Sequence, residues 1–182
     1  DDDSFAGVIS PDNSKLCYIR LAEPTRENPI GTKAYLAVSN IDGTSKKYLA
    51  LMLKISEEGN DSDIGIPRWL DNERIIFQAF SERTGNDGEI FITDLRGNFT
   101  SVTNNDVLEA FPCKDSKGRI FYLGTQMKEL LEYEKLTQER TRKKDYTQPQ
   151  IPPPDLSVYS SFNDRGRWQN KELKIEEDIS EF

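Results

Sequence analysis

Carboxylates and lysines are the side chains of this chain that could do chemistry, because it contains no histidine. Its 182 residues include 32 Asp and Glu, 24 Lys and Arg, and two cysteines. Ser-His-Asp and Cys-His nucleophilic catalysis both need an imidazole base. Two cysteines cannot supply a structural zinc site without histidine. What remains is carboxylate, lysine or oxygen-ligated metal chemistry.

The best candidate for a metal site is the run Asp-Ser-Asp-Ile-Gly at residues 61–65. Oxygen-bearing side chains at alternate positions are typical of the start of a calcium loop. This run lacks a ligand at the fifth position, its glycine comes one place early, and Asn72 stands where the last acid belongs. These defects favour a polar connecting loop over a calcium site.

Two other pairs of residues have a chemical and a structural interpretation. Glu132 and Glu134 would point to the same side of a strand, as acid/base catalysis could use, but an outer strand offers no burial to tune a catalytic acid. Trp69 and Trp168 stand next to matching turns and could stack a sugar or a peptide, but we expect them in the core. We therefore predict no catalytic, cofactor-binding or metal-binding residue and no cofactor.

Three further features have ordinary explanations. The basic run at residues 140–144 could bind an acidic partner or a lipid surface, but it is more typical of a solvated outer strand balanced by nearby glutamates. Asn98 begins a glycosylation sequon, which matters only in a secreted eukaryotic protein. Cys17 and Cys113 fall at different positions of the repeat described below, and we interpret them as core or boundary thiols without a disulfide.

Charge and hydropathy exclude several classes of protein. A net charge of −8 argues against non-specific binding of nucleic acid. No stretch approaches the roughly 20 apolar residues that a membrane helix needs. The chain opens on Asp1-Asp2-Asp3-Ser4, so we expect that a signal peptide either never existed or has been removed.

A polar turn around an aspartate recurs four times and organises the chain. The aspartates are Asp12, Asp71, Asp115 and Asp164, at spacings of 59, 44 and 49 residues, and an apolar strand follows each of the first three. Gly and Asn tolerate the positive φ of tight turns, and an Asp at the entry bonds the backbone two residues on. Self-similarity of this period indicates a repeat architecture.

The second half of each repeat aligns as well. Gly43 and Gly97 match at an offset of 54, and Asn40 matches Asp94. A repeat is therefore strand, Asp turn, strand, variable loop, strand, Gly turn, strand, which is the blade of a β-propeller. The variable loops, residues 22–32 and 81–88, join the second strand to the third.

The third repeat is ambiguous. Residues 129–144 have the propensity of a helix, but the repeat places residues 129–136 and 140–146 as the third and fourth strands, with Glu134 aligned to Asp94. We predict strands, because a blade without outer strands would expose an unpaired edge. The predicted divisions are blades one to three at residues 1–147, a proline-rich connector at 148–155, and the start of a further blade with an acidic tail at 156–182.

The motifs Ser10-Pro11-Asp12 and Asn40-Ile41-Asp42-Gly43 resemble the repeat of TolB-like β-propellers. The resemblance covers about residues 5–168, and only the first copy keeps Ser-Pro-Asp. Closed propellers of that family have six or more blades, whereas about three and a half are visible here. The family includes periplasmic adaptors and the non-catalytic propellers of oligopeptidase-type enzymes, so the resemblance implies protein or peptide partners.

We accordingly predict an all-β, propeller-like array of four-stranded antiparallel blades that is incomplete or closed by a partner chain. An uncovered blade face should carry apolar residues of the aligned position, Tyr18, Phe77 and Tyr122. The predicted function is non-catalytic protein–protein binding outside the cytoplasm, in the periplasm or the extracellular space, with a protein partner or a second copy. The alternative is the substrate-gating propeller of a peptidase or carbohydrate-active enzyme whose catalytic domain lies elsewhere.

Overall fold

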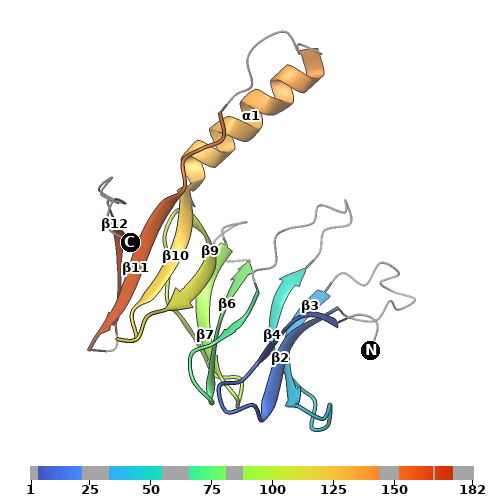
Figure 1. Cartoon of the computed structure of the whole chain (residues 1–182). Coiled ribbons are helices and arrows are strands. Elements are labelled where there is room, and N and C mark those ends of the chain that lie inside the picture. Colours follow the sequence, from blue (N-terminus) through green and yellow to red (C-terminus); the bar gives the residue numbers. More distant parts are fainter. Residues whose placement is uncertain are drawn as a thin grey trace, which may run out of the picture.

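The computed structural model describes residues 4–21, 33–54, 66–80, 88–143, 152–165 and 167–173. In these residues, three four-stranded antiparallel sheets lie side by side, and we call this array the fan (Figure 1). Within each sheet the strands lie in sequence order. None of the described helices is long and apolar enough to cross a membrane.

The first two blades are those that the repeat predicts. Blade one consists of β1 (Ser4–Ile9), β2 (Lys15–Leu21), β3 (Lys33–Asn40) and β4 (Lys47–Lys54). Blade two consists of β5 (Arg68–Trp69), β6 (Arg74–Phe80), β7 (Gly88–Asp94) and β8 (Phe99–Ser101). The turns at Asp12 and Asp71 join the first two strands of their blades, as predicted.

Blade three corrects the sequence-based assignment. Its strands are β9 (Val107–Lys114), β10 (Ile120–Gln126), β11 (Ser157–Asp164) and β12 (Arg167–Leu173). The prediction of strands at residues 129–144 was wrong, because helix α1 (Met127–Lys143) follows β10 directly. Its 17 residues are mostly strong helix formers, and their local preference prevails over the repeat register.

The segment assigned to a further blade completes blade three instead. β11 pairs with β10, with Ile120 opposite Ser161, so the edge of β10 is covered by a strand from beyond the prolines. The fourth aspartate, Asp164, therefore ends the third strand of blade three rather than the first strand of a fourth. Residues 152–165 and 167–173 thus contain two strands of blade three, and the described chain has three whole blades.

Two apolar clusters join the blades. Cys17, Ile19 and Leu36 of blade one pack with Ile75 and Phe77 of blade two, and all five are at most 1% exposed. Blades two and three meet through a second cluster of buried residues: Leu70, Ile76, Ile90, Val102, Val107, Ile120, Tyr122 and Tyr159. The core therefore lies between the sheets, and blade two is covered on both faces.

The aligned aromatic position faces the preceding blade. Phe77 is 1%, Tyr122 2% and Tyr18 8% exposed, so the expectation that these three residues lie on an uncovered face was wrong. Phe77 stacks on Phe91 with ring centroids 5.9 Å apart, and Tyr122 stacks on Tyr159 at 5.4 Å. Tyr18 occupies the same position in blade one, which no described blade precedes.

Hydrogen bonds at the ends of the strands fix how the blades sit on one another. Trp69 Nε1 donates to the carbonyl oxygen of Val8 at 2.8 Å, and Lys47 Nζ donates to that of Leu95 at 2.8 Å. Lys114 Nζ donates to the carbonyl oxygen of Leu70. Each bond joins one blade to the next through a backbone carbonyl oxygen.

The aspartates hold their own turns. Asp12 Oδ1 accepts hydrogen bonds from Ser10 Oγ at 2.7 Å and from Ser14 N at 3.0 Å. Asp71 and Asp115 bond the backbone in the same way and also pair with Arg74 and Arg119, respectively. Four residues of these turns have a positive φ that their residue types tolerate: Asn13 at 59°, Gly43 at 82°, Gly97 at 93° and Gly118 at 81°.

These hydrogen bonds favour the ionised carboxylates. The side-chain bond from Ser10, then the backbone and side-chain bonds from Ser14, lower the pKa of Asp12 from 3.8 to about 2. The pKa of Asp94 is also lowered, chiefly by the Asn98 side chain. In Asp71, desolvation acts to raise the pKa, but hydrogen bonds from Arg74 and Glu73 lower it overall. The turn aspartates are thus charged and structural at neutral pH.

We predict that Gly124→Ala destabilises blade three by about 1–3 kcal/mol, because a new methyl group would overpack its inner face. A Cβ at this position would lie 2.5 Å from Val107 Cγ1 and 2.9 Å from Tyr159 Cε2. Gly7→Ala is the matched control, because its Cβ would lie 3.4 Å from Leu16 Cδ1, an ordinary contact. Urea unfolding measures both; equal stability of the two variants would contradict the packing argument.

We also predict that Asp12 makes stability depend on pH in acid. Its folded pKa of about 2 is below the ordinary 3.8, so its stabilisation is complete above about pH 4 and is lost as the pH falls toward 2. Asp12→Asn keeps an acceptor oxygen but cannot ionise. The difference in urea midpoint between the wild type and this variant should be constant from pH 7 to 5 and shrink toward pH 2. A difference that does not change over that range would contradict the assignment.

Candidate functional site

The two edges of the fan carry different kinds of connection between strands (Figure 1). The turns that join first to second strands and third to fourth strands lie along one edge, which we call the turn edge. The connections from second to third strands leave from the opposite edge, which we call the loop edge. Because the turn aspartates are occupied by their own turns, the loop edge is the better place for function.

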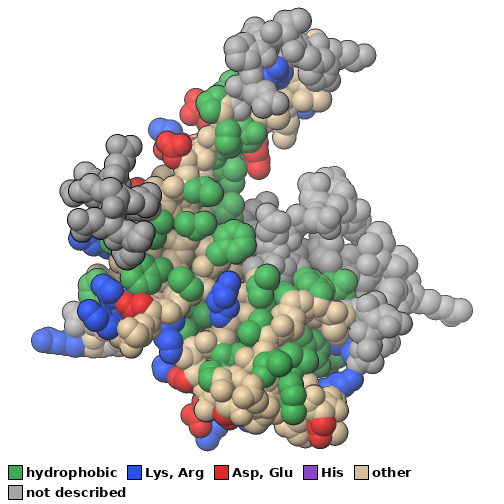
Figure 2. All heavy atoms as spheres, viewed as in Figure 1, with side chains coloured by type: hydrophobic (Ala, Val, Ile, Leu, Met, Phe, Trp, Pro, Cys, Tyr) green, Lys and Arg blue, Asp and Glu red, His purple; other side chains and the backbone are tan. Residues whose placement is uncertain are grey.

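Helix α1 rises from the loop edge at the end of β10 and stands clear of the sheets (Figure 1). None of its residues is buried. Leu131 is 57% exposed and Leu136 43%, and Figure 2 shows hydrophobic side chains among the charged ones along the helix. Its first turn is tied to blade three by a 2.9 Å hydrogen bond from Met127 N to the carbonyl oxygen of Asp106.

The helix also contains several residues that we predicted to lie on strands. Glu132 and Glu134 are exposed on α1, where residues two apart point about 200° apart rather than to one side. The basic residues of the run at 140–144 that the structure describes, Arg140, Arg142 and Lys143, lie in its last turn. Cations at this end interact favourably with the helix dipole. The outer-strand interpretation of both groups was therefore wrong.

The two tryptophans pack at the junctions of the blades. Trp69 packs against the cluster between blades one and two, and Trp168 against the cluster between blades two and three. This agrees with the expected core role. The calcium-like run at residues 61–65 lies outside the described residues. Asn98 of the sequon is exposed in the turn before β8.

The cysteines are free thiols, as expected. Cys17 is fully buried, and burial raises the pKa of its thiol to about 12, so it is an inert core residue. Cys113 is exposed on β9.

A pair of buried glutamates between blades two and three was missed from the sequence. Glu89 is 2% and Glu109 0% exposed, and Thr103 Oγ1 lies 2.6 Å from Glu89 Oε2 and 2.9 Å from Glu109 Oε2. Burial, with the charges of these glutamates, raises the pKa of Tyr122 to about 12. The sequence does give one indication of this pair. Glu109 comes two residues after the apolar Val107, so both side chains point to the same side of the strand, toward the core.

The pair does not by itself form a metal centre. Thr103 Oγ1 also accepts a hydrogen bond from Ile90 N at 2.8 Å, so the glutamates are part of a polar link between the sheets. Among the described residues there is no group of three or more His, Cys, Asp or Glu that could hold a metal ion.

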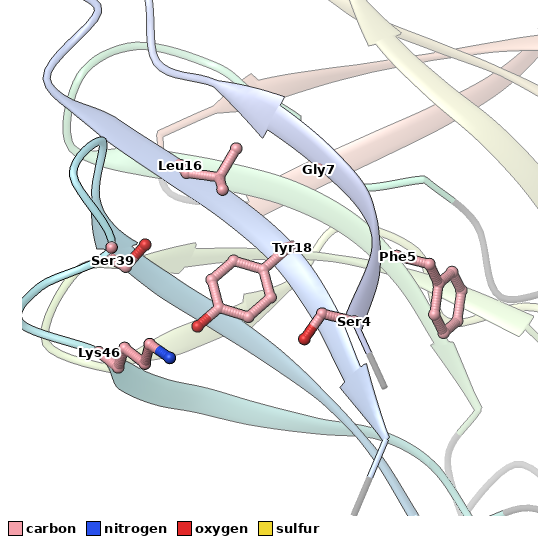
Figure 3. Close-up of a pocket in the computed structure, with 8 residues that line it drawn as sticks. Ser4, Phe5, Gly7, Leu16, Tyr18, Ser39 and Lys46 are labelled. Carbon is pink, nitrogen blue, oxygen red and sulfur yellow. The ribbon is translucent and has the colours of Figure 1, made fainter. Parts of the chain in front are cut away.

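The outer sheet face of blade one has a shallow recess of about 250 Å³ (Figure 3). Leu16 and Tyr18 of β2 form its floor, and Ser4, Phe5, Ser39 and Lys46 also line it. In Figure 3 the Tyr18 hydroxyl points toward the side of the recess where Lys46 lies. The recess is on the face of blade one that is turned away from blade two, and no described blade covers it.

Comparison with solved structures identifies the type of fold. No family model matches the chain, and no curated protein is similar to it. The AtxE2 isopeptidase with astexin3-dC4 bound superposes with a TM-score of 0.59 at 13% identity, over 93% of this chain and 28% of that one. TolB from Agrobacterium tumefaciens gives a TM-score of 0.52 at 18% identity, over 93% and 48% of the two chains.

The β-propeller domain of the Trilobed protease from Pyrococcus furiosus gives 0.53 at 12% identity, over 94% of this chain and 43% of that one. This chain therefore spans less than half the length of each of these proteins. At such identities the likeness concerns the fold and not the activity. Together with the three antiparallel sheets, it shows that this chain has a TolB-like β-propeller fold, with three consecutive blades.

Proposed function

We propose that this chain is a non-catalytic propeller module that binds another protein through its loop edge, outside the cytoplasm. The observation that carries the proposal is helix α1, which is inserted between the second and third strands of blade three and buries none of its residues. The blades form a rigid support, and the insertion is the element that differs from the plain repeat.

The energetics of α1 support a partner. Isolated helices of about 12–15 residues are marginal in water, because nucleation is costly and most helical stability in proteins comes from packing. Within the described residues, α1 is covered only in part: Met127, Leu130, Tyr133 and Arg140 are half-buried and the rest of its side chains are exposed. Met127 N is also bonded to the carbonyl oxygen of Asp106. Covering Leu131 and Leu136 with a partner would contribute about 1.5–3 kcal/mol for each side chain fully buried.

The proposed location rests on resemblance. The fold is that of TolB, and TolB-like propellers include periplasmic adaptors, so we infer a periplasmic or extracellular location. The two thiols neither favour nor oppose it, because a propeller of this size has enough core without a disulfide.

A second candidate is that these blades gate substrate access for a hydrolase in a larger assembly. It is favoured by the likeness to an isopeptidase with a bound peptide and to the propeller domain of a protease. In that case α1 would contact a catalytic domain, and its occupant would be an enzyme rather than an adaptor's partner.

The test is site-specific photo-crosslinking in cells that produce the protein. We expect a photoreactive residue at Leu131 to give one discrete protein adduct, because Leu131 lies on the exposed part of α1. Phe99 is the matched control, because it is 63% exposed on the outer strand of blade two, away from the helix. The adduct should weaken when the unlabelled chain is produced in excess in the same cells.

The identity of the adduct separates the two functions. A non-enzymatic protein supports the binding module, whereas a peptidase or carbohydrate-active domain supports gating. The same set of weak adducts at Leu131 and Phe99, or none at either, would overturn a partner at the loop edge.

We further predict that the double variant Leu131→Asp, Leu136→Asp weakens the captured complex at least tenfold while the urea midpoint of the blades is unchanged. Neither side chain is buried in the blades, so stability should not depend on them. Titration of the captured partner against both forms measures the affinity. A large fall in the midpoint would contradict the view that α1 stands free.

A further inference from the structure

We propose that Glu109, Thr103 and Glu89 form a hydrogen-bonded chain that holds one carboxyl proton between blades two and three at neutral pH, and that the interface loosens when this proton is lost. The chain of hydrogen bonds lies inside the structure, in the buried pair of glutamates described above. This inference goes beyond the proposed function, and it does not need a partner at the loop edge.

The hydroxyl group of Thr103 has one proton but two carboxyl neighbours. Its oxygen lies 2.6 Å from Glu89 Oε2 and 2.9 Å from Glu109 Oε2, and it accepts a 2.8 Å hydrogen bond from Ile90 N. A hydroxyl group donates one hydrogen bond and accepts at most two. Its single proton can therefore bond only one of the glutamates. The other glutamate makes a hydrogen bond to Thr103 only if it carries a proton of its own.

The two distances indicate which glutamate is protonated. A hydrogen bond from a hydroxyl group to an ionised carboxylate is typically about 2.5–2.7 Å long, and one between neutral oxygens is somewhat longer. The 2.6 Å contact therefore fits Thr103 donating to ionised Glu89, and the 2.9 Å contact fits protonated Glu109 donating to Thr103. Asn105 N also donates to Glu89 Oε1 at 3.3 Å, which favours the charged form of Glu89.

Two ionised carboxylates would be unfavourable at this place. Both glutamates are buried, so bulk water does not solvate their charges. Both also lie within hydrogen-bonding distance of the same oxygen atom, and like charges that share a site raise the cost of ionising the second group. One proton for the two carboxyl groups meets both constraints. The proton count on Thr103 holds whatever further contacts the carboxyl groups make.

Phenols and an amide face the pair from neighbouring strands that the structure describes. Burial, followed by the two glutamates, raises the pKa of Tyr122 on β10 to about 12, so this phenol is neutral. Tyr159 of β11 is stacked on Tyr122, and buried Gln78 of β6 lies beside Gly88 and does not titrate. Asp106, in the turn after Thr103, is exposed, and solvent screens its charge.

The shared proton lies at the base of helix α1. The turn between β8 and β9 contains Thr103 and Asn105, which contact the glutamates, and Asp106, whose carbonyl oxygen accepts the 2.9 Å hydrogen bond from Met127 N. One short turn therefore connects the pair to the first residue of α1. Loss of the proton would place two like charges around Thr103, so we expect this turn and its bond to the helix to loosen together.

The proton gives stability a pH dependence of opposite sign to that of Asp12. In the unfolded chain a glutamate ionises near its ordinary pKa of about 4.3, whereas in the folded chain Glu109 keeps its proton at neutral pH. Above that value the folded state binds more protons than the unfolded state. The stabilisation is therefore complete below about pH 4 and is lost as the pH rises.

Glu109→Gln tests the assignment, because its amide imitates a protonated carboxyl group and can donate to Thr103 at every pH. The urea midpoint of this variant minus that of the wild type should increase from about pH 5 to about pH 8. Glu132→Gln, the same change at an exposed glutamate of α1, should give a difference that does not vary with pH. Thr103→Ser keeps the hydroxyl group and should keep the wild-type pH dependence. A constant or decreasing difference for Glu109→Gln would overturn the proposal.

Glu89→Gln tests whether the proton is shared. With residue 89 uncharged, Thr103 can donate to an ionised Glu109, so this variant should also lose the pH dependence. It should be less stable than Glu109→Gln at pH 7, because it removes the ionised acceptor that Thr103 and Asn105 N both contact. If Glu89→Gln keeps the pH dependence of the wild type, the two glutamates titrate independently and the chain of hydrogen bonds is wrong.

Infrared difference spectroscopy detects the proton directly. The spectrum of the wild type at pH 7 minus that of Glu109→Gln should contain the C=O band of a protonated carboxylic acid, which is distinct from the bands of a carboxylate. The difference with Glu132→Gln should contain carboxylate bands alone. Carboxylate bands alone in the Glu109→Gln difference would mean that both buried glutamates are ionised, which would overturn the proposal.

Hydrogen exchange of the Met127 amide tests the link to α1. In the wild type, its protection relative to the intrinsic exchange rate should fall about tenfold or more from pH 6 to pH 8, and in Glu109→Gln it should stay constant. An equal change in both forms would contradict the link. None of these outcomes bears on the adduct at Leu131, so this proposal and the proposed function fail separately.

Discussion

Each sheet of this chain is apolar on both faces, and the rest of the structure depends on this constraint. In β2, Cys17 and Ile19 point to one side and Leu16 and Tyr18 to the other. A single sheet of this kind would leave both apolar faces in water, and one neighbouring sheet would cover only one of them, so sheets must be stacked in series. Blade two meets the requirement on both sides, and blades one and three meet it on one side each. The two apolar clusters between the blades follow from it.

The turn edge and the loop edge have different structural roles. At the turn edge, Asp12, Asp71 and Asp115 accept hydrogen bonds from the backbone of their own turns, which fixes the hairpins. At the loop edge, the number of residues between the second and third strands varies from blade to blade. Helix α1 belongs to the connection from Gln126 to Ser157, and it could be inserted without disturbing either cluster because it leaves from a strand end.

How much the sequence predicts depends on whether the signal is local. Blades one and two were predicted correctly because their turns, glycines and alternating strands lie within about 50 consecutive residues each. Blade three was not, because β11 pairs with β10 across α1 and the prolines, and no local pattern fixes Ile120 opposite Ser161. Asp164 led to the wrong assignment of a fourth blade, because the same kind of turn can join the first two strands or the last two strands of a blade. The pairing of Glu89 with Glu109 depends on how two blades stack, which a single strand does not encode.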